Sequence, residues 1–209
     1  MGVYNISKLN NIKEIQSEAW FRSKPWLILG TGESLERFTP DMKERFNIWA
    51  IYCAIEKTGY ADVLHYQDTY VNYYLDQPLN ADYKYSAVRP INHFKDGIYT
   101  YPNAYHPKNQ KFIYYNNDIQ YNGVEQPDGK VYPSSNSTSF AFMFLTEAKI
   151  GEIYSLGIDD GSTGVAKGLN KFYTDHFYAD QKTGELDLKK ENGCNEHWCS
   201  SNGVKWIRL

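Results

Sequence analysis

The 209-residue sequence lacks several features that would place a protein in a special class. It has no apolar run of about 18 residues, so we expect no membrane-spanning helix. Residues 1–5 lack the charged and apolar segments of a secretory leader, and Ile6 stands where a myristoylation signal prefers Ser or Thr. Cysteine is scarce, with three in the chain, which is typical of a reducing compartment rather than a disulfide scaffold. These absences predict a cytoplasmic protein.

A large excess of charge of one sign is also missing. The formal net charge is −3, which implies no general affinity for polyanions, although a local basic groove can lie in such a chain. Tyrosine, by contrast, is abundant, with 19 residues. A tyrosine combines an apolar ring with a polar tip, so it suits sugar faces, bases and wet interfaces as well as strand edges.

Short apolar segments bounded by turn residues predict a parallel α/β sheet. The segments that we interpret as strands are residues 26–30, 46–52, 61–66, 152–156 and 203–209. The order of strand, turn and helix at the start, and of helix and strand later, predicts one domain over residues 1–209. In it a mostly parallel sheet carries helices on both faces.

The connecting segments are predicted to be helical in four places. These are residues 8–22, residues 35–45 with Ser34 as N-cap and an interruption at Pro40, residues 54–58, and residues 140–149 ended by Gly151. Residues 162–200 are polar and are predicted to be loop-like, with short helical patches. Residues 70–133 are rich in Tyr, Asn, Asp and Pro, and we expect them to add one strand and otherwise form an irregular insertion or lid.

The segment Gly30-Thr31-Gly32-Glu33-Ser34 is typical of a phosphate-binding loop. It follows a predicted strand and opens a predicted helix, where unpaired N–H groups and the helix dipole stabilise an anion. It lacks the third glycine of a dinucleotide fingerprint, and Tyr52 and Cys53 stand where an acidic residue would be expected, so NAD binding is disfavoured. No Gly-Lys-Ser/Thr follows, which excludes a Walker A loop. A purely structural turn is the alternative.

Other polar groups follow predicted elements at the same edge of the sheet. The loop 135–138 could cap the next helix or donate to phosphate and ribose oxygens. Asp159 and Asp160 end a strand and could bind a metal, bind a sugar hydroxyl or begin a turn. Ligands of parallel sheets lie beyond the carboxyl ends of the strands, so we expect loops 30–34, 66–70 and 157–161 to converge.

Two further groups could carry chemistry. His176 follows an acidic residue and could act as a general base, or it could be an ordinary surface or core histidine. Cys194, His197 and Cys199 lie close together, but their spacing matches no standard zinc site.

Two spaced motifs point to a family. The segments 29–35 and Asn136-Ser137-Thr138, with 152–159 after them, resemble the bacterial lipooligosaccharide sialyltransferases of glycosyltransferase family 42. They are also similar to a related group that holds archaeal 6-hydroxymethylpterin diphosphokinases and motility-associated glycosyltransferases. The resemblance covers residues 25–68 and 134–160 and implies a Rossmann-like fold.

The resemblance also implies roles for single residues. The residues implied to contact a nucleotide-sugar donor are Gly30, Thr31, Gly32, Ser34, Asp68, Asn136, Ser137 and Thr138. Asp159 would close the site from its strand and, with His176, is predicted to be catalytic; His197 is the alternative base. The family has asparagine, proline and asparagine where this chain has Thr31, Glu33 and Tyr52, so the donor need not be a CMP-sugar.

We therefore expect a glycosyltransferase that moves a sugar from a nucleotide sugar to an acceptor hydroxyl and requires no cofactor. The acceptor could be a glycan, a lipid-linked sugar or modified nucleic acid, held against a wall formed by residues 70–133. One alternative is a Mg²⁺-dependent diphosphokinase-like enzyme with Asp68, Asp159 and Asp160 as ligands. Another is a non-catalytic nucleotide or glycan binder, and the chain could form a homo-oligomer.

Overall fold

The structure is a computed structural model. It describes residues 2–5, 10–11, 16–51, 53–66, 82–88, 94–95, 98–101, 111–114, 137–160, 166, 169 and 181–209. Among the helices of these segments, none combines the length and the apolar character needed to cross a membrane.

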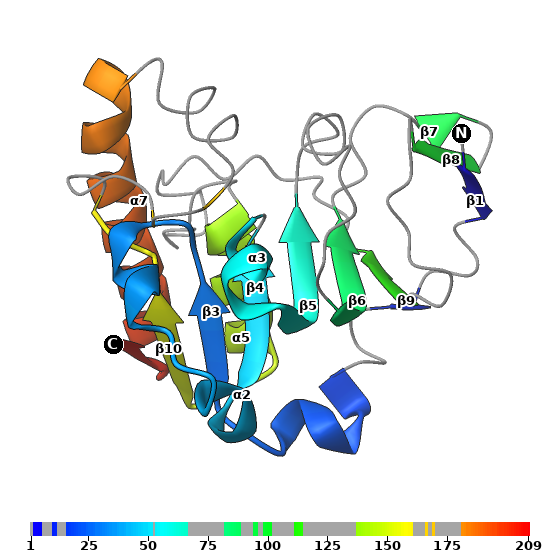
Figure 1. The fold of residues 1–209 in the computed structure, drawn as a ribbon, viewed down its shortest axis with the longest axis horizontal. Helices are drawn as coiled ribbons and strands as arrows, with labels where there is room; N and C mark the ends of the chain where they lie inside the picture. The colour runs from blue at the N-terminus through cyan, green and yellow to red at the C-terminus, as the bar shows by residue number, and fades with distance from the viewer. Residues whose placement is uncertain are drawn as a thin grey trace.

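An eight-stranded sheet forms the centre of the molecule (Figure 1). Its strands are β2 (Asn10–Asn11), β3 (Trp26–Leu29), β4 (Asn47–Ile51), β5 (Tyr60–Tyr66), β6 (Asp82–Val88), β9 (Lys111–Tyr114), β10 (Glu152–Leu156) and β11 (Lys205–Arg208). They lie in the order β11-β10-β3-β4-β5-β6-β9-β2, and every neighbouring pair is parallel. The predicted parallel sheet is confirmed.

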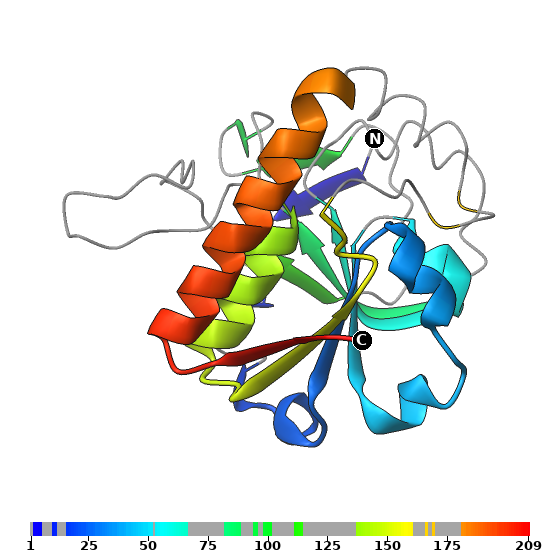
Figure 2. The same ribbon diagram turned by 90° about the vertical axis from the view of Figure 1, so that its left-hand side faces the viewer.

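Helices cover both faces of this sheet, as Figure 2 shows. One face carries the short helices η3 (Glu33–Arg37), α2 (Met42–Arg45) and α3 (Ala54–Thr58). The other face carries α5 (Ser137–Glu147) and α7 (Gln181–Ser201), which lie side by side. Because both faces are covered, the central strands β3 and β4 are buried along their whole length, which explains their unbroken apolar sequence. The chain therefore has the α/β, Rossmann-like architecture expected from its sequence.

A second, three-stranded antiparallel sheet lies beside the main one (Figure 1). It is built from β1 (Gly2–Asn5), β8 (Ile98–Tyr101) and β7 (Phe94–Lys95). The region 70–133 thus supplies two strands of the main sheet, β6 and β9, where we expected one, and two strands of the small sheet. Its role as a lid stays a prediction.

Aromatic side chains fill the core near the amino ends of the strands. The 3-10 helix η2 (Ala19–Arg22) places Phe21 against Trp26, with 4.9 Å between ring centroids, and the Trp26 indole N–H donates to the Phe21 carbonyl at 2.9 Å. Trp26 contacts Trp49 on the next strand, and Phe144 of α5 contacts both Phe21 and Trp49. These rings join the sheet to α5.

The predicted helix over residues 8–22 is found only in part. Residues 10–11 form β2, residues 16–17 are helical and residues 19–22 form the short η2, while residues 12–15 lie outside the described residues. The predicted helix over residues 35–45 is interrupted around Pro40, as expected, and becomes η3 and α2. Its N-cap is Gly32 rather than Ser34, because the Ser34 hydroxyl bonds to a distant segment instead of a local amide.

The later helices also differ from expectation. The left-handed turn after α5 is made by Lys149, with φ of 57°, and not by Gly151. The segment predicted to be loop-like contains the 21 residues of α7. Its buried side includes polar Asn192 and Asn195, which are 4% and 0% exposed, so the apolar periodicity that would predict a helix is weak.

Candidate functional site

The site lies where the strand order of the main sheet reverses. β3 is followed along the chain by its neighbour β4 on one side, whereas its other neighbour, β10, comes much later in the sequence. Ligands of open α/β sheets bind at the carboxyl ends of the strands at such a switch point. The segments after β3 and β10 are Gly30–Ser34 and Gly157–Asp160.

Two glycines cross at this point with their main chains in contact. The Gly30 N–H donates to the Leu156 carbonyl at 2.8 Å, and the Gly32 N–H donates to the Gly157 carbonyl at 2.9 Å. A Cβ atom on Gly30 would lie 2.2 Å from the Gly157 oxygen. Gly157 has φ of 68°, and its added Cβ would lie 2.3 Å from the Gly30 oxygen. Only glycine fits either position, so the two loops are fixed against each other.

Ser34 and Asp159 form a clasp between the same loops. One carboxylate oxygen of Asp159 accepts the Ser34 N–H at 2.8 Å, and the other accepts the Ser34 hydroxyl at 2.5 Å. The Ser34 oxygen in turn accepts the Gly157 N–H at 2.7 Å. A Cβ on Gly32 would lie 2.4 Å from the Asp159 carboxylate, so Gly32 also makes room for the clasp.

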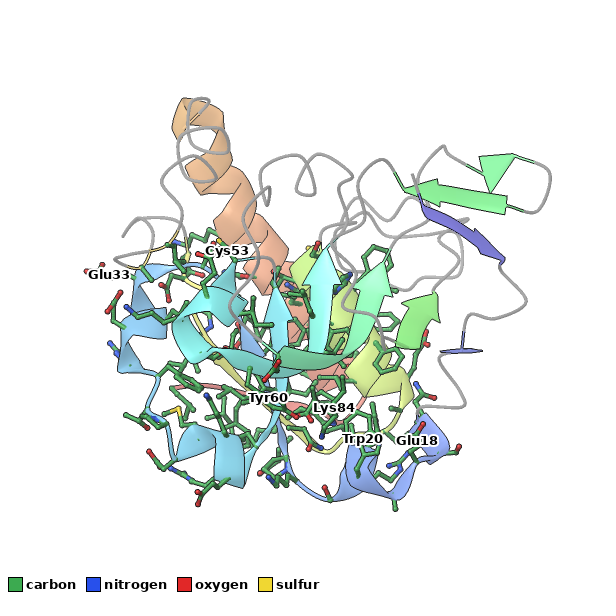
Figure 3. The ribbon with its side chains drawn as sticks, turned by 45° about the vertical axis from the view of Figure 1, so that its right-hand side comes forward. Glu18, Trp20, Glu33, Cys53, Tyr60 and Lys84 are labelled. Carbon is green, nitrogen blue, oxygen red and sulfur yellow. The ribbon has the colours of Figure 1, made fainter. Side chains whose placement is uncertain are left out.

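The loop is also held from the segment that follows β10. The Thr31 carbonyl accepts the Ala166 N–H at 3.0 Å, and over the described residues the Thr31 N–H has no hydrogen-bond partner. The Glu33 side chain is exposed and lies on the outer side of η3 (Figure 3). The Glu33 carboxylate is therefore not buried inside the loop.

The second aspartate of the pair faces other elements. Asn192 of α7 donates from its amide to the Asp159 carbonyl at 3.2 Å and to the Asp160 carboxylate at 3.0 Å. Arg208 of β11 pairs with the same Asp160 oxygen at 3.1 Å. The hydrogen bond from Asn192, followed by the charge of Arg208, lowers the pKa of Asp160.

These contacts bear on the magnesium alternative. Both carboxylate oxygens of Asp159 already accept hydrogen bonds, and one oxygen of Asp160 accepts two. Asp68, the third proposed ligand, lies outside the described residues. Over the described segments, no group of three or more His, Cys, Asp and Glu side chains is arranged to hold a metal ion. The magnesium alternative therefore stays a prediction.

The cysteines and His197 do not come together at this edge. Burial raises the pKa of the Cys53 and Cys199 thiols to about 12, whereas Cys194 is partly exposed on α7. His197 is exposed near the end of α7, with its ring near the Ser201 hydroxyl. The chain enters β11 at its amino end soon afterwards, so His197 lies on the side of the sheet away from the glycine crossing.

Two of the remaining expected residues are described and three are not. Ser137 is buried and Thr138 half-buried in the first turn of α5. Asp68, Asn136 and His176 lie outside the described residues.

The sequence analysis overlooked His65, near the carboxyl end of β5. It is fully buried, accepts the Trp49 indole N–H at 3.3 Å on Nδ1 and packs edge-on against Phe140 of α5. Burial lowers its pKa to about 3, so it is neutral at physiological pH. The sequence signal that could have identified His65 was a histidine within an otherwise apolar predicted strand.

Comparison with known proteins finds relatives in structure alone. No protein-family model matches the chain, and no curated protein matches it. The crystal structure of a Tyr-to-Phe variant of the sialyltransferase Cst-II in complex with CMP covers 89% of this chain and 81% of its own, with a TM-score of 0.51 and 12% identity. The sialyltransferase CstII from Campylobacter jejuni, in complex with the substrate analogue CMP-3FNeuAc, has the same coverage, a TM-score of 0.48 and 11% identity.

At this identity the likeness establishes the fold. It supports the sialyltransferase-like fold that the resemblance in the sequence implies. The chain thus has a sialyltransferase-like α/β fold, with its glycine loop, Ser34 and Asp159 brought together where the strand order reverses.

Proposed function

We propose that this protein is a glycosyltransferase that binds a nucleotide-sugar donor between the carboxyl ends of β3 and β10. The observation that carries the proposal is the glycine crossing with its Ser34–Asp159 clasp, built at the switch point of the sheet. The likeness to a sialyltransferase structure in complex with CMP agrees with it.

The donor phosphate is proposed to lie against the open side of the 30–34 loop. The Thr31 N–H would donate to its oxygens, and Gly30 and Gly32 allow the main chain to approach closely. The hydroxyls of Ser137 and Thr138, in the first turn of α5, would contact the donor from the other face of the sheet. Asn136 and Asp68 are proposed to complete the donor site.

Ser34 and Asp159 have a different proposed role. Both are already engaged with each other, so they would hold the loop in its binding shape rather than release their hydrogen bonds to the ligand. Holding Asp159 in this way also keeps its negative charge directed at the Ser34 N–H and hydroxyl instead of at the phosphate.

The proposed chemistry is a direct displacement. The acceptor hydroxyl oxygen attacks the anomeric carbon, the bond from that carbon to the phosphate oxygen breaks, and the nucleotide leaves with the bonding electron pair. His176 is the proposed base that takes the hydroxyl proton. Amide donors at the loop would stabilise the negative charge that develops on the leaving phosphate.

Calorimetric titration with CMP, other nucleotides and nucleotide sugars tests the proposal. We expect one of them to bind the wild-type protein and Gly32→Trp to abolish that binding, because the new side chain fills the loop. Gly151→Trp is the matched control, since a Cβ at Gly151 meets nothing within 4 Å and the residue lies at the opposite end of β10. His176→Ala should retain donor binding and lose transfer.

Failure of the whole panel to bind the wild-type protein would overturn the proposal. Donor binding with no turnover towards any acceptor or water would instead indicate a non-catalytic binder.

A further inference from the structure

Helix α7 extends well past the carboxyl edge of the sheet (Figures 1 and 2). Asn192 bonds to the end of β10, so it marks the level of that edge along the helix. The turns from Gln181 to Asn192 therefore rise roughly 16 Å beyond it, at 1.5 Å per residue. Below that level α7 packs against α5 and β11, and the contact through Asn192 fixes it at the carboxyl edge.

Asn192 provides that fixed point. Its side chain is 4% exposed, and its amide group donates to two acceptors on consecutive residues, the main-chain carbonyl of Asp159 and the carboxylate of Asp160. The same Asp159 holds Ser34 through its carboxylate. One side chain of α7 is thus connected through a single residue to the 30–34 loop.

We propose that Asn192 is a positioning residue for the donor site: its amide fixes Asp159 and Asp160 at the end of β10, and thereby the Asp159–Ser34 clasp that shapes the 30–34 loop. Its significance for catalysis rests on the glycosyltransferase function proposed above, whereas its effect on the clasp does not. Arg208 of β11 pairs with the same Asp160 oxygen and so holds this carboxylate from a second element.

The chemistry of the contact requires an amide donor. Both partners of Asn192 are acceptors, so an aspartate of the same shape would face a carbonyl and a like charge. Asn192→Asp is therefore expected to disturb the clasp more than Asn192→Ala, which only removes the donor.

Native-state hydrogen exchange measures the clasp directly. In Asn192→Ala we expect the Ser34 and Gly157 amides, both donors in the clasp, to exchange about tenfold faster, which corresponds to the loss of about one hydrogen bond. Asn202→Ala is the matched control, in the turn directly after the same helix. Asn202 makes one side-chain bond to the Trp198 carbonyl at 2.8 Å, far from the edge, and its loss should leave both amides unchanged.

Titration with CMP, or with the nucleotide that binds best, supplies the second readout. We expect about tenfold weaker binding in Asn192→Ala and unchanged binding in Asn202→Ala. Unchanged Ser34 exchange in Asn192→Ala would overturn the inference. A wild-type protein that binds no nucleotide would overturn the proposed function instead, and the exchange data would still decide the positioning role.

Exchanging the side chains of Asn192 and Asp160 tests the two hydrogen bonds of Asn192 separately. Asn192→Asp combined with Asp160→Asn restores an amide–carboxylate pair between the two positions but leaves the Asp159 carbonyl without a donor. We expect the double variant to recover part of the protection lost in Asn192→Asp. Absence of any recovery would contradict the part of the inference that runs through Asp160.

Discussion

Two aspartates at opposite edges of the sheet make nearly the same hydrogen bonds. Towards the amino edge, Asp62 of β5 accepts the Ile48 N–H at 2.9 Å and the Tyr60 hydroxyl at 2.7 Å. At the carboxyl edge, Asp159 accepts the N–H and the hydroxyl of Ser34. Each carboxylate therefore binds one main-chain amide and one hydroxyl, and each joins neighbouring segments.

The two differ in charge compensation. Asp62 is 4% exposed and pairs with the Lys84 ammonium at 2.6 Å, which itself lies 5.2 Å from the Trp20 ring centroid (Figure 3). Asp159 is only half-buried, and the described part of the chain supplies no ion pair to it. Within the described residues, the carboxylate at the amino edge is therefore held by a cation as well as by hydrogen bonds, whereas the Asp159 carboxylate is held by its hydrogen bonds to Ser34.

Breaking the glycine crossing should have the largest effect. Gly30→Ala places a Cβ against the Gly157 main chain, which cannot turn away as a side chain could. We expect the free energy of unfolding to fall by about 3 kcal/mol or more in urea titrations. Gly151→Ala, where a Cβ meets nothing within 4 Å, is the control and should stay close to the wild type. Equal stability of the two variants would show that the loops do not cross as described.

Removing each aspartate in turn sharpens the comparison. Asp62→Ala leaves the Ile48 N–H and Lys84 without their acceptor, and we expect a loss of about 2 kcal/mol in stability, since Lys84 is half-exposed and can regain water. The nucleotide affinity of the Asp62→Ala variant should not change. Asp159→Ala should cost less stability, about 1 kcal/mol, and weaken nucleotide binding about tenfold. Equal effects on binding would remove the distinction between the two edges.

Acid is expected to act on the stability of the fold through His65. The folded protein keeps His65 neutral down to a pKa of about 3, whereas the unfolded chain takes up a proton below its ordinary value of 6.5. The contribution of neutral His65 to the stability of the fold is therefore fully present above pH 6.5 and is lost as the pH falls below that value. Between pH 7.5 and 5.5 we expect this histidine to remove about 1.4 kcal/mol. Urea titrations of the wild type and of His65→Gln at both pH values measure this contribution. An equal change in the free energy of unfolding between the two pH values in both proteins would contradict it.

The sequence was sufficient to predict the central strands because they are buried on both faces. β3 and β4 match the predicted segments closely, since apolar runs bounded by turns leave few alternatives. Helix α7 was missed for the opposite reason. Its buried side carries Asn192 and Asn195, and Gly184 and Gly193 interrupt its helix-forming sequence.

The site was predicted in its parts but not in its connections. The glycine loop and the Gly157–Asp159 segment were predicted as candidate functional segments from their positions after strands, and the structure brings them together. That the Ser34 hydroxyl binds Asp159 could not be read from the sequence, because local rules make a serine at a helix start a cap for its own helix. Likewise, nothing local to Asn192 indicates that it faces the end of β10.

The unequal burial of the three cysteines has a practical consequence. Maleimides react with the thiolate, so Cys53 and Cys199, with pKa values near 12, should stay unmodified in the folded protein. Cys194 is partly exposed and lies two positions after Asn192 on α7. The wild-type chain therefore carries its own attachment point for a fluorophore, one that would report on the helix at the edge of the proposed donor site without any engineered residue.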